Sequence, residues 1–207
     1  MLKRVSTALL AAAAVWLSGA ENLVKNPSFE NGTEGWENPS WLINLIVPKR
    51  DRTVSFKGKA SLKFSGRPGK VVCFHQKINL PAGTKEVTFA SRIKTSGLLR
   101  GWMAAIHLTF YGGPEGKQLK EYIRGTDWQK PENDWLLCGD CVPVPEGTTK
   151  AFIALRMYHA HDRKGEPDNL GCAWFDDLQL YAGNVPEVLP KKDEAATGNP
   201  GPEIRAQ

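Results

Sequence analysis

The chain has 207 residues, with 27 Lys and Arg against 22 Asp and Glu, which gives a formal net charge of +5. This length predicts one domain with a short extension, and it is enough to bury a sizeable hydrophobic core. The sequence has no run of Lys or Arg and no nucleic-acid-binding motif, so nucleic acid is not an expected partner. Its 20 Gly, 14 Pro and 7 Trp suit a protein rich in strands and loops better than a helical one.

Residues 1–20 have the features of a secretory signal peptide. Lys3 and Arg4 precede an apolar run, and the small residues Ser18 and Ala20 suit a cleavage site. The apolar run is too short to span a bilayer and no second long run follows, so no membrane-spanning helix is predicted. Cleavage would also remove Lys3 and Arg4 from the 27 basic residues, which leaves 25 basic against 22 acidic residues and a net charge of +3. We therefore expect a secreted or periplasmic protein after cleavage near Ala20.

Apolar and polar residues alternate with period two through the central region of the sequence. The alternating runs are residues 60–64, 71–80, 87–95, 102–110, 151–158 and 173–181. Gly- and Pro-rich breakers separate them, and no segment has the pattern of a three-turn amphipathic helix. This spacing predicts an all-β fold, an antiparallel β-sandwich or jelly roll, over residues 21–183. Residues 184–207, with four Pro and no aromatic residue, are predicted to form a disordered C-terminal tail.

Four short motifs, in a fixed order, resemble those of the CenC-type carbohydrate-binding modules. They are residues 22–30 (NLVKNPSFE) followed by Gly35 and Trp36, then 58–63 (GKASLK), 76–83 (QKINLPAG) and 174–180 (WFDDLQL). The resemblance covers nearly the whole mature domain and implies a galactose-binding-like β-jelly roll. It also implies a non-catalytic protein that binds a polysaccharide or oligosaccharide in a groove on one face of the sandwich.

The resemblance further implies a structural Ca²⁺ that ties the opening motif to the last strand. Glu30 and Asp176 would supply side-chain oxygens, because Ca²⁺ takes about six to eight hard oxygen ligands. Ser28 and Lys59 would supply backbone carbonyls, and Asp177 is the alternative to Asp176. The turn TVSFKGK before the second motif carries no acidic side chain, which leaves this ligand set short. The metal-free alternative is that the two carboxylates accept hydrogen bonds from backbone amides.

The four cysteines are expected to form disulfides, because an even number of Cys in an exported chain favours disulfides over thiols. Of the possible pairings, Cys138 and Cys141 would close a tight local disulfide, leaving Cys73 with Cys172. Zinc binding and redox chemistry are the alternatives. A zinc site commonly has a second CxxC pair, which this sequence lacks, and a redox CxxC normally opens a helix.

The residues that alternate with core positions along a strand face outward. By this rule Arg92, His107, Arg156 and Tyr158 point away from the core. In CenC-like modules an exposed concave face holds the glycan, and sugar recognition needs aromatic faces together with planar or charged hydrogen-bond donors. These four residues are therefore the candidate ligand site, and two Arg would suit an anionic sugar.

Three tryptophans, Trp41, Trp102 and Trp128, sit in or beside predicted loops. An exposed Trp on a loop is a platform for a sugar ring, whereas a packed one covers the end of the sandwich. The sequence alone leaves open which of the three is exposed.

Two alternatives to glycan binding stay open. A non-glycan adhesion or protein-interaction module of the same fold would have a flatter apolar patch. An enzyme, such as a glycan hydrolase or lyase, needs a positioned carboxylate pair, or a base with a charge-neutralising partner. The sequence has no nucleophile elbow, no HExxH motif and no P-loop, so we predict no catalytic residues.

Overall fold

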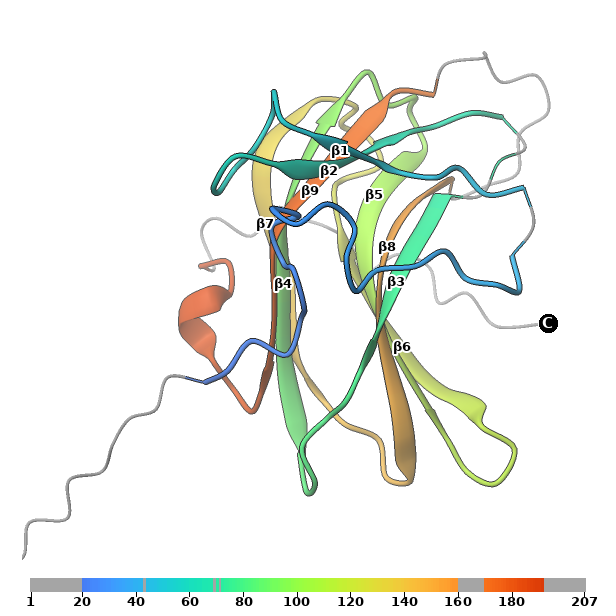
Figure 1. Cartoon of the computed structure of the whole chain (residues 1–207), viewed down its shortest axis with the longest axis vertical. Helices are drawn as coiled ribbons and strands as arrows, with labels where there is room; N and C mark the ends of the chain where they lie inside the picture. The colour runs from blue at the N-terminus through green and yellow to red at the C-terminus, as the bar shows by residue number, and fades with distance from the viewer. Residues whose placement is uncertain (1–19, 43, 69, 71, 160–169, 192–207) are drawn as a thin grey trace, which may run out of the picture.

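The computed structural model describes residues 20–191 except 43, 69, 71 and 160–169, and these residues form two sheets (Figure 1). The elements are β1 (Lys49–Asp51), β2 (Ser61–Ser65), β3 (Val72–Ile78), β4 (Glu86–Ser96), β5 (Trp102–Gly112), β6 (Lys117–Gly125), β7 (Asn133–Pro143), β8 (Thr148–His159), β9 (Cys172–Ala182) and a 3-10 turn η1 (Pro186–Val188). The predicted all-β fold is confirmed.

The two sheets pack face to face as an antiparallel sandwich. One sheet has the strand order β1-β2-β9-β4-β7 and the other β3-β8-β5-β6, and every pairing between these strands is antiparallel. Most neighbours within a sheet are not consecutive in the chain, and β9 lies between β2 and β4. Chain crossings of this kind are typical of jelly rolls.

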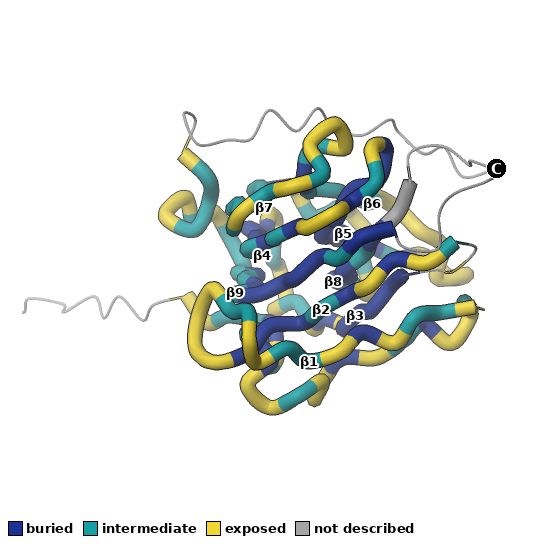
Figure 2. Tube along the Cα trace, turned by 90° about the horizontal axis from the view of Figure 1, so that it is seen from above, coloured by how far each residue is buried: buried dark blue, intermediate teal, exposed yellow. Residues whose placement is uncertain are grey.

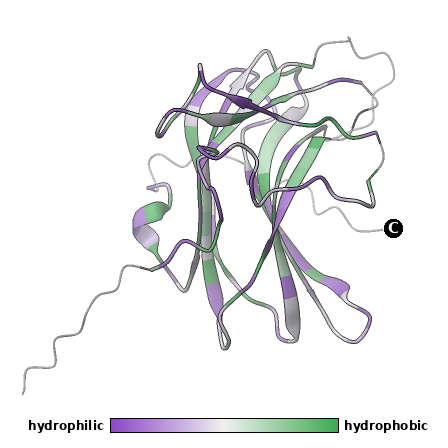
Figure 3. Cartoon of the chain, in the orientation of Figure 1, coloured by the Kyte–Doolittle hydropathy of each residue, from purple (hydrophilic) through white to green (hydrophobic). Residues whose placement is uncertain are grey.

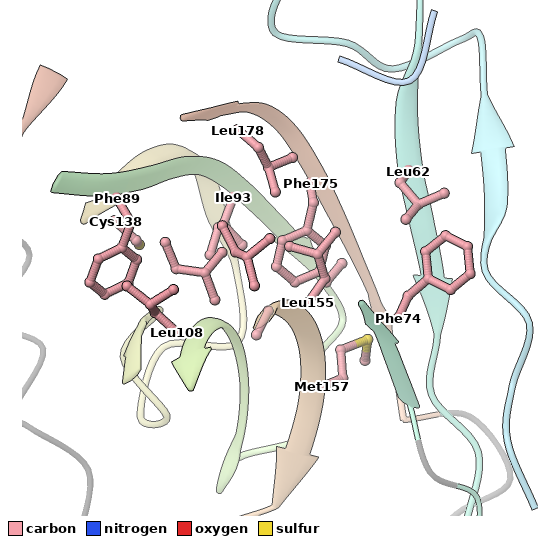
Figure 4. Close-up of a cluster of buried hydrophobic side chains, with 14 of the residues drawn as sticks. Leu62, Phe74, Phe89, Ile93, Leu108, Cys138, Leu155, Met157, Phe175 and Leu178 are labelled. Carbon is pink, nitrogen blue, oxygen red and sulfur yellow. The ribbon is translucent and has the colours of Figure 1, made fainter. Parts of the chain in front are cut away.

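The hydrophobic core lies between the inner faces of the sheets. Figure 4 shows Phe89, Ile93 and Phe175 of the five-stranded sheet meeting Leu108 and Leu155 of the four-stranded sheet. All five side chains are fully buried. Figure 3 shows hydrophobic and hydrophilic residues on the same strands, and in Figure 2 the central strands are buried while the loops are exposed. Both agree with strands that have one face toward the core.

The ends of the domain differ in part from the prediction. The predicted signal peptide lies outside the described residues apart from Ala20. Beyond residue 183 the chain continues into η1, and the Val185 N–H donates a hydrogen bond of 2.9 Å to Thr88 Oγ1 on β4. Within the predicted tail, residues 186–188 thus form a 3-10 turn, and residues 192–207 lie outside the described part. No helix among the described residues has the length and apolar character to cross a membrane.

The disulfide prediction is wrong, since all four cysteines are free. Cys138 and Cys141 stand three residues apart on β7, so strand alternation puts Cys138 in the core and Cys141 on the outer side. Cys73 faces outward from the four-stranded sheet, between the core residues of β3. Cys172 faces outward from the five-stranded sheet, where its Sγ lies 3.5 Å from Ser65 Oγ. The members of each predicted pair thus point away from one another.

Thiol labelling tests this arrangement. We expect iodoacetamide to alkylate all four cysteines of protein unfolded without reductant, as counted by mass spectrometry. In the native protein Cys138 should react slowest, because burial raises its pKa to about 12 and the thiolate is the reactive form. The partly exposed Cys141 and Cys172 should react first. Two cysteines that become labelled only after reduction would contradict the free-thiol arrangement.

Candidate functional site

The outer face of the four-stranded sheet gathers aromatic and polar side chains. On β5, Ile106 and Leu108 are fully buried against the other sheet. His107 and Thr109 therefore face outward, and the same alternation on β8 turns Arg156 outward. Because β5 and β8 are hydrogen-bonded neighbours, these side chains share one surface.

Four aromatic rings cross this surface as a continuous row, here called the aromatic strip: Trp41, His75, Phe152 and Tyr111. The His75 ring lies 5.1 Å from that of Trp41 and 5.1 Å from that of Phe152, with an interplanar angle of 22° to Phe152. The Tyr111 ring meets the Phe152 ring edge-on at 5.7 Å. Trp41 comes from the loop before β1, and the other rings come from the neighbouring strands β3, β8 and β5.

The four rings of the strip differ in their exposure to solvent. Trp41 is 62% exposed, whereas His75 is 4% exposed. Phe152 and Tyr111 are half-buried. Because three of the four rings stand on hydrogen-bonded strands, the sheet sets their spacing.

A polar cluster of His107, Thr109, Glu121 and Arg156 lies on the same face. His107 Nδ1 and Glu121 Oε1 are 2.9 Å apart, and Thr109 Oγ1 donates a hydrogen bond of 3.2 Å to the same carboxylate oxygen. His107 is only 1% exposed, so it orients Glu121 from beneath. Glu121 and Arg156 are half-buried and are the members of the cluster that reach solvent.

Burial decides the protonation of the histidine in this cluster. Burial lowers the pKa of His107 below its ordinary 6.5, and the hydrogen bond with Glu121 opposes this only in part. Burial raises the pKa of Glu121, but the hydrogen bond from His107 and the nearby charge of Arg156 outweigh it and hold that pKa below 4.5. At neutral pH, Glu121 is ionised and His107 is neutral, with its Nδ1–H donating to the carboxylate.

Two exposed lysines flank the aromatic strip. Lys77 stands opposite Phe152 in the register of β3 and β8, and Lys150 stands opposite Tyr111 in the register of β8 and β5. Residues directly opposite one another in a sheet have their side chains on the same face. Lys77 and Lys150 therefore place positive charge beside the rings.

The structure divides the predicted ligand residues between two faces. His107 and Arg156 lie on the same outer face, and Tyr158 follows on β8, although its side chain lies outside the described part of the structure. Arg92 is on β4 of the other sheet, where its guanidinium lies 4.5 Å from the centre of the Phe56 ring. The prediction that Arg92 joins this site is wrong, because alternation separates inside from outside but does not assign a strand to a sheet.

Sequence reasoning missed three members of the aromatic strip as ligand candidates: His75, Tyr111 and Phe152. The available signal was their outward position on alternating strands, but their contact becomes visible only when the strand order is known. Of the three loop tryptophans, Trp41 lies in the strip, Trp102 is 7% exposed, and Trp128 is 40% exposed. Exposure alone would not have distinguished Trp41 from Trp128.

The carboxylate of Asp176, part of the predicted calcium site, is surrounded by hydrogen-bond donors. The residue is fully buried. Its Oδ2 accepts from the backbone N–H groups of Phe56 at 2.7 Å and Lys57 at 2.9 Å, and its Oδ1 accepts from that of Asp177 at 2.7 Å. The Ser28 hydroxyl donates a further hydrogen bond. Burial raises the pKa of Asp176, and these hydrogen bonds oppose the rise.

Glu30 is held in the same way. Its Oε1 accepts a hydrogen bond of 2.6 Å from the Lys59 N–H, and its Oε2 lies 3.6 Å from Arg50 Nη2. The groups that approach both predicted carboxylate ligands are thus N–H and O–H donors, whereas calcium needs oxygen lone pairs. This set of donors fits the metal-free alternative, in which both carboxylates accept hydrogen bonds from backbone amides, better than it fits a calcium ion. No three His, Cys, Asp or Glu side chains within the described ranges are grouped to hold a metal.

Comparison with known proteins supports the fold assignment. No family model and no curated protein matches the chain. Among solved structures, a Family 16 Carbohydrate Binding Module-2 is similar, with a TM-score of 0.56 and 18% identity over 77% of this chain and 99% of that one. TmCBM61 in complex with beta-1,4-galactotriose has a TM-score of 0.50 and 16% identity over 79% of this chain and 100% of that one.

A third similar structure is the N-terminal CBM22-1-CBM22-2 tandem domain of Paenibacillus barcinonensis Xyn10C. Its TM-score is 0.60 at 14% identity, and the match covers 84% of this chain and 53% of that one. At these identities the likeness shows the fold alone, because one fold can carry many different functions. The predicted jelly roll is therefore confirmed, and these three similar structures carry the names of carbohydrate-binding modules.

We expect acid to destabilise the fold through His107. Because its pKa is lower in the folded protein, the unfolded state binds more protons below about pH 6.5, and stability falls as the pH drops through this range. Glu121, whose pKa is also lowered, adds a further loss as the pH falls below its ordinary value of 4.5. The melting temperature of the wild type should therefore fall between neutral pH and pH 5.

The His107→Gln variant isolates the contribution of this histidine. Its melting temperature should depend less on pH over the same range, because Gln cannot take up the proton. Some dependence should persist, since burial also lowers the pKa of His75. Parallel curves of melting temperature against pH for wild type and variant would contradict the assignment.

Proposed function

We propose that this protein is a secreted, non-catalytic carbohydrate-binding module of the CenC type that binds an oligosaccharide or polysaccharide along the aromatic strip. The observation that carries the proposal is the continuous contact of Trp41, His75, Phe152 and Tyr111 on one outer face. A pyranose ring packs its C–H face on an aromatic ring and hydrogen-bonds its hydroxyls to charged or planar groups. The strip and the polar cluster together supply both kinds of partner.

The residues of the proposed site have different roles in binding. Trp41, Phe152 and Tyr111 form the floor on which sugar rings stack, and the buried His75 ring packs between Trp41 and Phe152 and supports them. Glu121 accepts hydrogen bonds from sugar hydroxyls, and Arg156 donates to them. His107 is a positioning residue, because it is buried and acts through Glu121. Since the rings and the carboxylate are held before binding, little side-chain freedom is lost on association.

The flanking lysines extend the proposal to anionic glycans. Lys77 and Lys150 are exposed and lie beside the two rings at the inner end of the strip. A carboxylate or sulfate on the sugar would meet them in a position where solvent still screens the charge, so we expect modest selectivity rather than an absolute requirement. The ligand class is therefore a glycan chain, with uronate- or sulfate-bearing chains preferred.

The surroundings of Glu121 support a binding role rather than hydrolysis. Glycoside hydrolysis uses two carboxyl groups on opposite sides of the scissile bond. Glu121 instead shares one oxygen with His107 and Thr109, which orient it as a hydrogen-bond acceptor. The structural neighbours described by carbohydrate-binding-module names also support this role.

Trp41→Ala and Phe152→Ala test the site. Each variant removes one stacking ring, so each should weaken glycan binding by about tenfold or more, or about 1.4 kcal/mol. Binding is measured by affinity electrophoresis against neutral, uronate-containing and sulfated polysaccharides, followed by isothermal titration with the best ligand. Trp128→Ala is the matched control, because it removes an exposed loop tryptophan outside the strip and should bind like the wild type.

The outcomes separate the function from the site. If both strip variants bind the glycan with wild-type affinity, the binding site does not include the aromatic strip. Absence of binding to every glycan, by a protein that circular dichroism shows to be folded, would overturn the function. In Lys77→Glu and Lys150→Glu, affinity for acidic chains should fall while affinity for neutral chains is kept. Equal losses for both kinds of chain would contradict the charge preference.

A further inference from the structure

Three segments that are distant in the sequence meet on the five-stranded sheet beside β9. They are the opening segment 22–30, residues 52–59 of the loop between β1 and β2, and Asp176 and Asp177 of β9, which are joined by hydrogen bonds. Figure 1 shows β1, β2 and β9 side by side. The opening segment runs along β9 through backbone hydrogen bonds, including Leu23 N–H to Leu180 O at 2.8 Å and Leu178 N–H to Pro27 O at 3.0 Å. This meeting point is called the clasp below.

The clasp concentrates three carboxylates, which must be compensated. Buried Asp176 receives three backbone N–H groups and the Ser28 hydroxyl. Asp177 pairs with Lys57, whose Nζ lies 2.9 Å from Asp177 Oδ1. The third carboxylate is that of Glu30, whose neighbours are Arg50 and the backbone N–H of Lys59.

Arg50 takes the oxygens of Glu30 that a metal would need. Its Nη2 donates to the Glu30 backbone carbonyl and lies 3.6 Å from Glu30 Oε2. A carbonyl oxygen and a carboxylate oxygen are the two ligand types that calcium collects in proteins. Here a single guanidinium nitrogen, Nη2, contacts both oxygens. The Arg50 side chain is 23% exposed, so this contact is partly shielded from solvent.

The other carboxylate oxygen of Glu30 is seated on the loop backbone. It accepts the Lys59 N–H, and the neighbouring residue is Gly58, whose φ is +70°. A Cβ on Gly58 would collide with Glu30 Oε1. Glycine therefore allows the carboxylate to rest against the loop, where the peptide N–H holds it without a metal.

We infer that Arg50 replaces a bound metal ion as the cation of the clasp, so that this domain folds and remains stable without calcium. Lys57 supplies the second positive charge, and the peptide N–H groups of the loop neutralise buried Asp176. The inference concerns the fold and is independent of the proposed glycan site.

The experiment compares the melting temperature of the mature protein in excess EDTA and in excess CaCl₂. We expect the same melting temperature in both, no heat of calcium binding by isothermal titration, and no stoichiometric calcium by mass spectrometry of protein purified without chelator. A lower melting temperature in EDTA, or saturable calcium binding, would overturn the inference.

Two variants test Arg50 itself. Arg50→Met should lower the melting temperature by several degrees, because it leaves the Glu30 carbonyl and carboxylate without their cation. Arg52→Met is the matched control, since Arg52 is exposed two residues away, and it should melt like the wild type. Arg50→Lys keeps the positive charge on a side chain of different shape. Its melting temperature should lie between those of the wild type and Arg50→Met. Equal melting temperatures for wild type and Arg50→Met would show that Arg50 does not hold the clasp.

Discussion

The apolar contact between the inner faces of the two sheets is the constraint on which the rest of the molecule depends. Once Phe175 and Ile93 pack against Leu108 and Leu155, each outward side chain on these strands has a fixed direction. The outer face of the four-stranded sheet then receives its aromatic and polar residues as a consequence of filling the core. Because a change of register by one residue would bury the outer set and expose the inner one, the energetics of the core also fix the geometry of this outer face.

The two outer faces use the same kinds of side chain for different purposes. On the four-stranded sheet, Phe152 contacts both His75 and Tyr111, and Trp41 is open to solvent. On the five-stranded sheet, Lys63 lies 4.8 Å above the ring of Trp174, which is only 7% exposed. The Lys63 ammonium helps to cover the Trp174 ring, whereas the Trp41 and Tyr111 rings meet Phe152 edge-on and Trp41 stays exposed.

Period-two alternation was sufficient to predict the sandwich and the outward direction of His107 and Arg156. It was not sufficient for Arg92, because the same outward direction exists on both sheets and strand order is determined by contacts distant in sequence. The cysteine prediction failed for a related reason. A CxxC spacing suggests proximity, but in an extended strand positions three apart lie on opposite faces, as Cys138 and Cys141 do. The aromatic strip needed the register as well as the alternation, so no single segment of the sequence revealed it.

The position of β9 has a consequence for how the protein reaches its native state. This strand completes the five-stranded sheet between β2 and β4, and the opening segment bonds to it across 156 residues, from Asn22 to the Leu178 carbonyl. Folding therefore cannot proceed strand by strand from the N-terminus. A fold with many pairings between segments distant in the sequence is also expected to fold slowly. Until β9 arrives, β2 and β4 each expose an unpaired edge to other chains. Between the synthesis of β4 and the docking of β9, the chain is thus most exposed to aggregation and has the greatest need of a chaperone.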